Sequence, residues 1–170
     1  MLGTDWYKRW RHARGFGIHS PSAYRLVREV LRPGSAYAYY AYEDIGRARR
    51  ALPNLLSQNE LELIFRLLLH FRPASVCIPS GPSSATLEFI VKTALPGATL
   101  TTGPAEMAIV EGRESVPPSG ATIVYFTDSS NPSLATLADA VTTGHILRNP
   151  TRALVITTPR LPKQTFQISF

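Results

Sequence analysis

The chain has 170 residues, of which 44% are hydrophobic and 18% charged, and its one cysteine is Cys77. That length suits one domain, or one domain with a small appendage, and the apolar share is typical of a globular protein rather than a disordered one. The sequence has no run of 18 apolar residues and opens with no apolar signal segment, so we expect a cytoplasmic protein without a membrane span. A single cysteine excludes an internal disulfide and argues against a cysteine-built zinc site.

The positive charge is concentrated at the amino-terminal end. Residues 1–50 hold ten Lys or Arg and four Asp or Glu, which accounts for the net charge of +6, whereas residues 51–170 hold eight of each. This asymmetry predicts two units with different roles. We place a basic, helical amino-terminal cap at residues 1–52 and a larger core at residues 53–170.

The segment from Trp6 to Arg14 mixes aromatic and basic side chains. Such a mixture can hold phosphates and stack on bases, which would make the cap a nucleic-acid surface. The other interpretation is an amphipathic helix whose aromatic side chains pack inward while the charged ones face water. We favour the packed helix.

Several helices have start and stop signals. Ser20 before Pro21 is an N-cap followed by the residue best tolerated at the first helical position, and Pro33-Gly34 ends that helix. We expect a second helix from Glu43 to Arg50. Residues 57–60, Ser-Gln-Asn-Glu, match a capping box and predict a third helix that runs to about residue 71.

The core alternates between strand and helix patterns after that point. The apolar runs predict strands at Ser75–Ile78, Ala98–Thr102, Ala121–Phe126, Ala153–Thr157 and Thr165–Phe170. The intervening segments predict helices at 84–94, at 106–114 and from Asn131-Pro132 to a stop at Gly144. Strands that alternate with helices favour βαβ units, so we predict an α/β fold with a mostly parallel sheet.

Ligands of such sheets bind beyond the carboxyl ends of the strands. After the first strand come small residues, from Pro79 through Ser84, that lead into a helix and could either bind a nucleotide or form a plain turn. Thr102 follows the second strand. Asp128 follows the predicted strand Ala121–Phe126, where it could bind a ligand or hydrogen-bond Ser130 and cap the next helix. We favour the capping role.

One stretch of the sequence resembles a known group of proteins. Residues 17–24, Gly-Ile-His-Ser-Pro-Ser-Ala-Tyr, are similar to the G-[IV]-H-S-P-F-V-[YF] segment of bacterial class I S-adenosylmethionine-dependent methyltransferase-like proteins. The closing residues 163–170 also resemble the carboxyl-terminal strand of that group. The resemblance implies a Rossmann-like core, S-adenosylmethionine as cofactor and methyl transfer to a small nucleophile that the sequence does not name.

The resemblance also implies roles for particular residues. Ser80, Gly81 and Ser83 would lie against the methionine part of the cofactor and Thr102 beside its ribose. Asp128 would be the catalytic residue, near the methyl group or the acceptor.

The chain departs from the pattern E-x-G-x-G-x-G that ends the first strand of such enzymes. Cys77, Pro79 and Ser83 stand where the acid and two of the glycines are expected, and Gly81 alone matches. Thr102 also replaces the acid that would hold the ribose. Each lost hydrogen bond to a carboxylate weakens binding about tenfold to a hundredfold, which implies a degraded cofactor site and little activity. The alternative function is a non-catalytic module whose basic cap binds RNA or an acidic protein.

Overall fold

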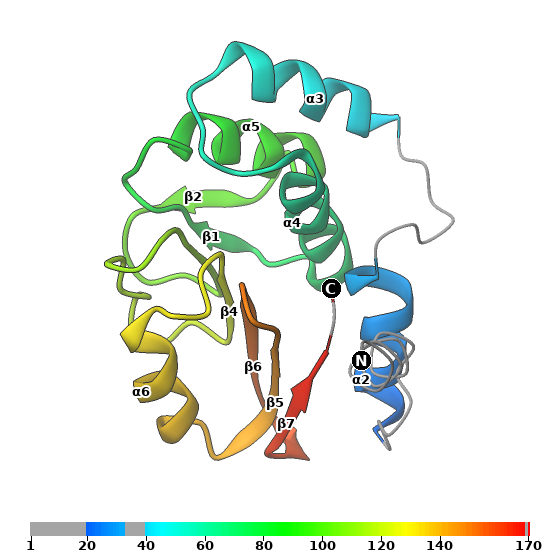
Figure 1. Cartoon of the computed structure of the whole chain (residues 1–170), viewed down its shortest axis with the longest axis vertical. Helices are drawn as coiled ribbons and strands as arrows, with labels where there is room; N and C mark the ends of the chain where they lie inside the picture. Colours follow the sequence, from blue (N-terminus) through cyan, green and yellow to red (C-terminus); the bar gives the residue numbers. More distant parts are fainter. Residues whose placement is uncertain (1–19, 33–39, 169) are drawn as a thin grey trace, which may run out of the picture.

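A central sheet with helices on both faces organises this protein (Figure 1). The computed structural model describes residues 20–32, 40–168 and 170. Within them, seven strands form one mostly parallel sheet, so the α/β, Rossmann-like fold class is confirmed. No helix in the described part of the chain is long and apolar enough to cross a membrane.

The helices begin where the sequence predicts. Ser20 caps α2, its Oγ accepting from the backbone N–H of Ala23 at 3.4 Å, and Ser57 caps α4 by accepting from Glu60 at 3.3 Å. Asn131 caps α6 in the same way, through Ser133 at 2.9 Å. The described helices are α2 (Pro21–Leu26), the π-helix η1 (Val27–Leu31), α3 (Ala41–Ala51), α4 (Gln58–Phe71), α5 (Ser84–Ala94) and α6 (Pro132–Ala140).

The strands of the sheet lie in the order β2-β1-β3-β4-β6-β5-β7. Strand β6 runs antiparallel to both of its neighbours, β4 and β5, and all other described pairs are parallel. The strands are β1 (Ser75–Cys77), β2 (Thr99–Thr101), β3 (Met107–Val110), β4 (Ile123–Phe126), β5 (Thr143–Arg148), β6 (Ala153–Pro162) and β7 (Gln164–Gln167).

Two expectations about this region are wrong. The helix predicted over 106–114 is in fact strand β3, which pairs with β1 and β4 in the middle of the sheet. The helix α6 already ends at Ala140, so Gly144 does not stop it but belongs to β5, a strand that the sequence did not predict. Strand β3 joins the sheet through partners distant in the sequence, whereas β5 forms an antiparallel hairpin with β6, the next strand along the chain.

Alternate residues of the strands point to opposite faces of the sheet. One face carries Met107, Ile109 and Tyr125, which pack with α4, α5 and η1 in the larger apolar cluster. The other carries Ala108 and Val124, which pack with Leu134 of α6 in the smaller cluster. Burial on both faces explains why β3 and β4 lack polar alternation.

Candidate functional site

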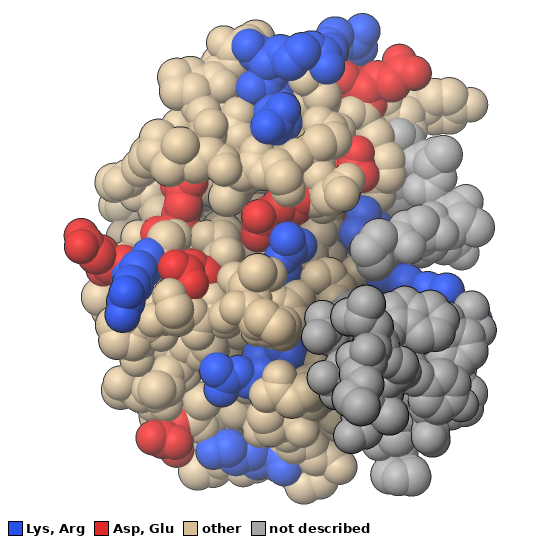
Figure 2. Space-filling view, in the orientation of Figure 1, with Lys and Arg blue, Asp and Glu red and all other residues tan. Residues whose placement is uncertain are grey.

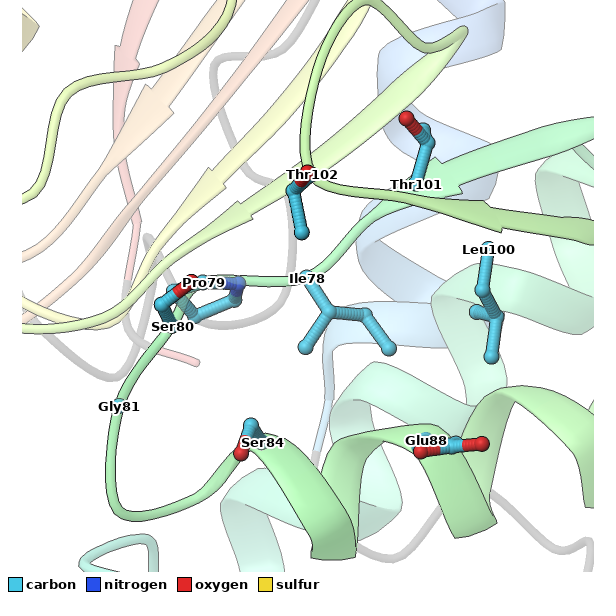
Figure 3. Close-up of a pocket in the computed structure, with 9 residues that line it drawn as sticks. All are labelled: Ile78, Pro79, Ser80, Gly81, Ser84, Glu88, Leu100, Thr101 and Thr102. Carbon is cyan, nitrogen blue, oxygen red and sulfur yellow. The ribbon is translucent and has the colours of Figure 1, made fainter.

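A pocket of about 650 Å³ lies at the carboxyl ends of β1 and β2, bounded on one side by α5. Figure 3 shows the chain leaving β1, turning at Pro79, Ser80 and Gly81, and entering α5 at Ser84. This is the position at which open α/β sheets bind ligands. The pocket is lined by Ile78, Pro79, Ser80, Gly81, Ser84, Glu88, Leu100, Thr101 and Thr102.

The structure brings three of the five predicted site residues to this pocket. Ser80, Gly81 and Thr102 line it together, although they come from two different loops. Ser83 does not line it. That side chain is fully buried, accepts a hydrogen bond from the backbone N–H of Leu55 at 2.9 Å and donates one to Glu111. Ser83 therefore holds the loop between β1 and α5 in place through these two hydrogen bonds and does not face the pocket.

Glu111 is a strand-end carboxylate that the sequence analysis missed. It follows β3 directly, and one carboxylate oxygen, Oε1, accepts from Ser83. The other oxygen, Oε2, is buried and has no hydrogen-bond partner in the described part of the chain. A β-carbon placed on Gly81 would lie 3.0 Å from Oε2, so this position needs a glycine unless the carboxylate moves. The run Met-Ala-Ile-Val before Glu111-Gly112, read as a strand, would have predicted this residue.

Asp128 lies apart from the described pocket. Its Oδ1 accepts from the backbone N–H of Ser130 at 2.8 Å and from the Ser130 hydroxyl at 2.7 Å. These hydrogen bonds hold the pKa of the Asp128 carboxyl below its usual value. The hydrogen bond to Ser130 was expected, but the cap of α6 is Asn131. In this geometry Asp128 closes a turn.

The charge of the pocket restricts what it can hold. Of the residues that line it, Glu88 is the one ionisable group, and it forms an exposed ion pair with Lys92 one turn further along α5. The remaining lining side chains are hydroxyls of Ser and Thr and the apolar groups of Ile78, Pro79 and Leu100. No basic side chain is among the described residues that line the pocket, so the one charge that they present is the carboxylate of Glu88.

Other candidates fall outside the described residues. These are the aromatic and basic segment from Trp6 to Arg14 and residues 17–19 of the segment that carries the resemblance. Within the described residues, no three His, Cys, Asp or Glu side chains come together in a way that could hold a metal ion.

The chain was also compared with known proteins. No family model matches it, no curated protein matches it, and no solved structure matches it.

Proposed function

We propose that this chain binds S-adenosylmethionine in the pocket beyond β1 and β2 and uses it as a methyl donor. The observation that carries the proposal is a carboxyl-edge pocket with one carboxylate and no basic group among its described lining residues. A pyrophosphate would meet backbone N–H groups at the start of α5 but no basic side chain among these residues, and its two negative charges would share the pocket with the carboxylate of Glu88. S-adenosylmethionine carries a sulfonium, an ammonium and a carboxylate group on its methionine part, so its net charge is positive and opposite to that of the one lining carboxylate, Glu88.

The lining residues provide contacts of three kinds. The Ser80–Gly81 turn faces the methionine part, the hydroxyl of Thr102 hydrogen-bonds the ribose, and the apolar groups of Ile78 and Leu100 pack against the flat face of the base. Ser83 and Glu111 support the turn instead of contacting the ligand. Because Asp128 is engaged with Ser130, it is given no contact with the ligand in this proposal.

When bound, S-adenosylmethionine would supply an electrophilic methyl carbon, which would pass to the nucleophilic acceptor as the carbon–sulfur bond breaks with its electron pair remaining on sulfur. The chain's contribution to such a displacement is alignment of the two reactants and exclusion of water. The proposed function thus depends on the shape of the pocket more than on a titrating side chain.

A thermal-shift titration of the full chain tests the proposal. S-adenosylmethionine and S-adenosylhomocysteine should raise the melting temperature in a saturable way, because a ligand that binds only the folded state stabilises it by about 2.7 kcal/mol at a hundred times its Kd. NAD and ATP at the same concentrations should not. If ligand concentrations up to about 10 mM cause no shift, the binding free energy is weaker than about 3 kcal/mol. That result would overturn the proposal.

A pair of threonine variants then locates the site. Thr102→Val removes a lining hydroxyl and should weaken the binding of S-adenosylhomocysteine about tenfold, as expected for one lost hydrogen bond. Thr99→Val is the control, because Thr99 is exposed on β2, the strand that leads to Thr102, but is not among the lining residues. Equal binding by both variants would mean that the ligand binds elsewhere.

A further inference from the structure

The charged residue of the pocket comes from a helix and not from a strand end. Glu88 lies in α5 and lines the same pocket as Thr101 and Thr102 of the β2 end. Figure 3 shows Glu88 on the side of β2 toward which Leu100 points, whereas Thr101 points to the other side of the strand. Thr102 stands at the position where the resemblance to methyltransferases implies an acid, so any carboxylate in this part of the pocket has to come from another element.

Half of the Glu88 carboxylate is already engaged. Oε1 accepts from the ammonium group of Lys92, an i,i+4 pair whose side chains are 49% and 63% exposed. Such exposed helix pairs are weak and exchange readily with water. The other oxygen, Oε2, makes no hydrogen bond to any described residue. Glu88 can therefore accept hydrogen bonds from a ligand without breaking a buried contact.

The surroundings of Glu88 select the ligand group that would meet it. An ionised carboxylate only accepts hydrogen bonds, so its partner must donate them. The Oγ1 of Thr101 already accepts from the backbone N–H of Gly103 at 3.0 Å, so the hydroxyl that remains to donate or accept is that of Thr102, and Leu100 offers an apolar surface. A vicinal diol fits this set, because its two hydroxyls can donate to one carboxylate while its carbon skeleton lies on the apolar side chain. Ribose hydroxyls held by a carboxylate are a recurring arrangement in nucleotide-binding α/β proteins.

We propose that Glu88 of α5 binds the 2′- and 3′-hydroxyls of the ribose of the nucleoside ligand, in place of an acid at the end of β2. This inference rests on the proposed function, since it concerns the ligand of the same pocket. It names Glu88 as a specificity-determining residue that distinguishes ribonucleosides from deoxyribonucleosides. It also means that the carboxylate of Glu88 on α5 contributes the binding free energy that an acid at the position of Thr102 would otherwise contribute.

The test measures the Kd of S-adenosylhomocysteine and of its 2′-deoxy analogue by calorimetry, with the full chain and with Glu88→Gln. The unmodified chain should bind the 2′-deoxy analogue about tenfold to a hundredfold more weakly, as expected for one hydrogen bond to a charged group. Glu88→Gln should weaken the binding of S-adenosylhomocysteine more than that of the analogue, because the analogue keeps only its 3′-hydroxyl as a donor to Glu88. The ratio of the two Kd values should therefore fall to about threefold or less, which is smaller than the effect of one typical neutral hydrogen bond on affinity.

Glu114→Gln is the matched control, because it removes the same charge from an exposed residue outside the lining of the pocket. It should keep both affinities. Melting of the unliganded variants checks that Glu88→Gln is folded, as expected for a side chain that is half exposed. If Glu88→Gln keeps the full discrimination, the inference is wrong while the proposed function stands. If the unmodified chain binds neither ligand, both are wrong.

Discussion

His145 lies inside the protein, where its imidazole joins helix α2 to strand β5. The ring is 3% exposed, and its Nε2 lies 3.3 Å from the hydroxyl oxygen of Ser20 and 3.2 Å from that of Ser22. Its edge packs against Phe166 of β7, with ring centroids 5.6 Å apart. The serine of the Ser20-Pro21 pair therefore has two roles, since it caps α2 and also holds that helix to the sheet.

The environment of His145 predicts a loss of stability in mild acid. Burial lowers the pKa of the imidazole, and the neighbouring backbone of Gly144 opposes only part of that shift. The neutral ring is thus favoured by folding, so the free energy of unfolding should fall as the pH drops from about 6.5, the pKa of an unfolded histidine, toward the folded pKa. Urea unfolding at pH 7.5 and at several lower values should show this slope.

His145→Asn provides the comparison for that experiment. It should be less stable than the unmodified chain at pH 7.5 and should depend less on pH. His70 is a second histidine whose pKa is lowered by burial, but it lies at the carboxyl-terminal end of α4. His70→Asn should therefore keep the part of the slope that comes from His145. A slope that is unchanged in His145→Asn would contradict the prediction.

The amino-terminal end of α4 combines a helix cap with a buried polar contact. Ser57 caps the helix, but the Glu60 side chain does not return to the capping residue as in a complete capping box. Instead, its Oε1 accepts from the hydroxyl of Tyr125 at 2.8 Å and lies 3.8 Å from Arg152. Burial is the main reason why the pKa of the Tyr125 hydroxyl is raised, and the charge of Glu60 adds to it. Glu60 thus ties α4 to β4.

The cap can be tested separately from that contact. Ser57→Ala removes the hydrogen bond to the Glu60 backbone N–H and should lower the free energy of unfolding by about 1 kcal/mol, the usual cost of an N-cap. Chemical denaturation at neutral pH measures the change. Ser119→Ala, at an exposed loop position, should be neutral within about 0.5 kcal/mol. A loss for Ser57→Ala as small as that for Ser119→Ala would mean that water replaces the cap.

Elements with clear local signals could be predicted from the sequence, whereas the short strand β3 and the hairpin strand β5 could not. The caps at Ser20, Ser57 and Asn131 use hydrogen bonds between near neighbours, so the helices that they begin were predicted. Strand β3 is a four-residue apolar run flanked by helix-forming residues, and such runs do not distinguish a strand from a buried helix. In β5, Gly144 has a φ of 119°, and a β-carbon there would lie 1.9 Å from the Ile156 carbonyl oxygen. That glycine permits close approach to β6, which its sequence neighbours do not indicate.

The same distinction applies to the site. Ser80, Gly81 and Thr102 follow predicted parallel strands, and the rule that ligands bind at carboxyl ends was enough to bring them together. Glu88 stands within a helix, where a glutamate is usually a solvated surface residue. Its place in the pocket depends on how α5 packs on the sheet, a tertiary feature that no local pattern carries.

At the scale of the whole molecule, the cap and the sheet share one apolar core. Leu26, Val27 and Leu31 of α2 and η1 belong to the same cluster as Leu61 and Ile64 of α4, and all five are at most 3% exposed. Arg66 of α4 adds two hydrogen bonds across the predicted boundary at residue 52, to the backbone oxygen of Val30 at 2.8 Å and to the hydroxyl of Tyr42 at 2.9 Å. Figure 2 shows basic side chains gathered at the top of the molecule, over α3, so the described cap residues present charge outward while their apolar side chains face the core.

This shared core predicts that residues 53–170 do not fold alone. Removing residues 1–52 would expose the α4 side chains that now pack on η1 and α3, and loss of a single large buried apolar side chain already costs about 2–5 kcal/mol. Because the stability of a whole domain is about 5–15 kcal/mol, loss of several such contacts should unfold the fragment. Circular dichroism and binding of a hydrophobic dye measure the outcome, and we expect weak, non-cooperative melting and strong dye binding by the fragment. The full chain should melt cooperatively. A fragment that melts cooperatively within a few degrees of the full chain would mean that the sheet carries its own core and that the cap is an independent unit.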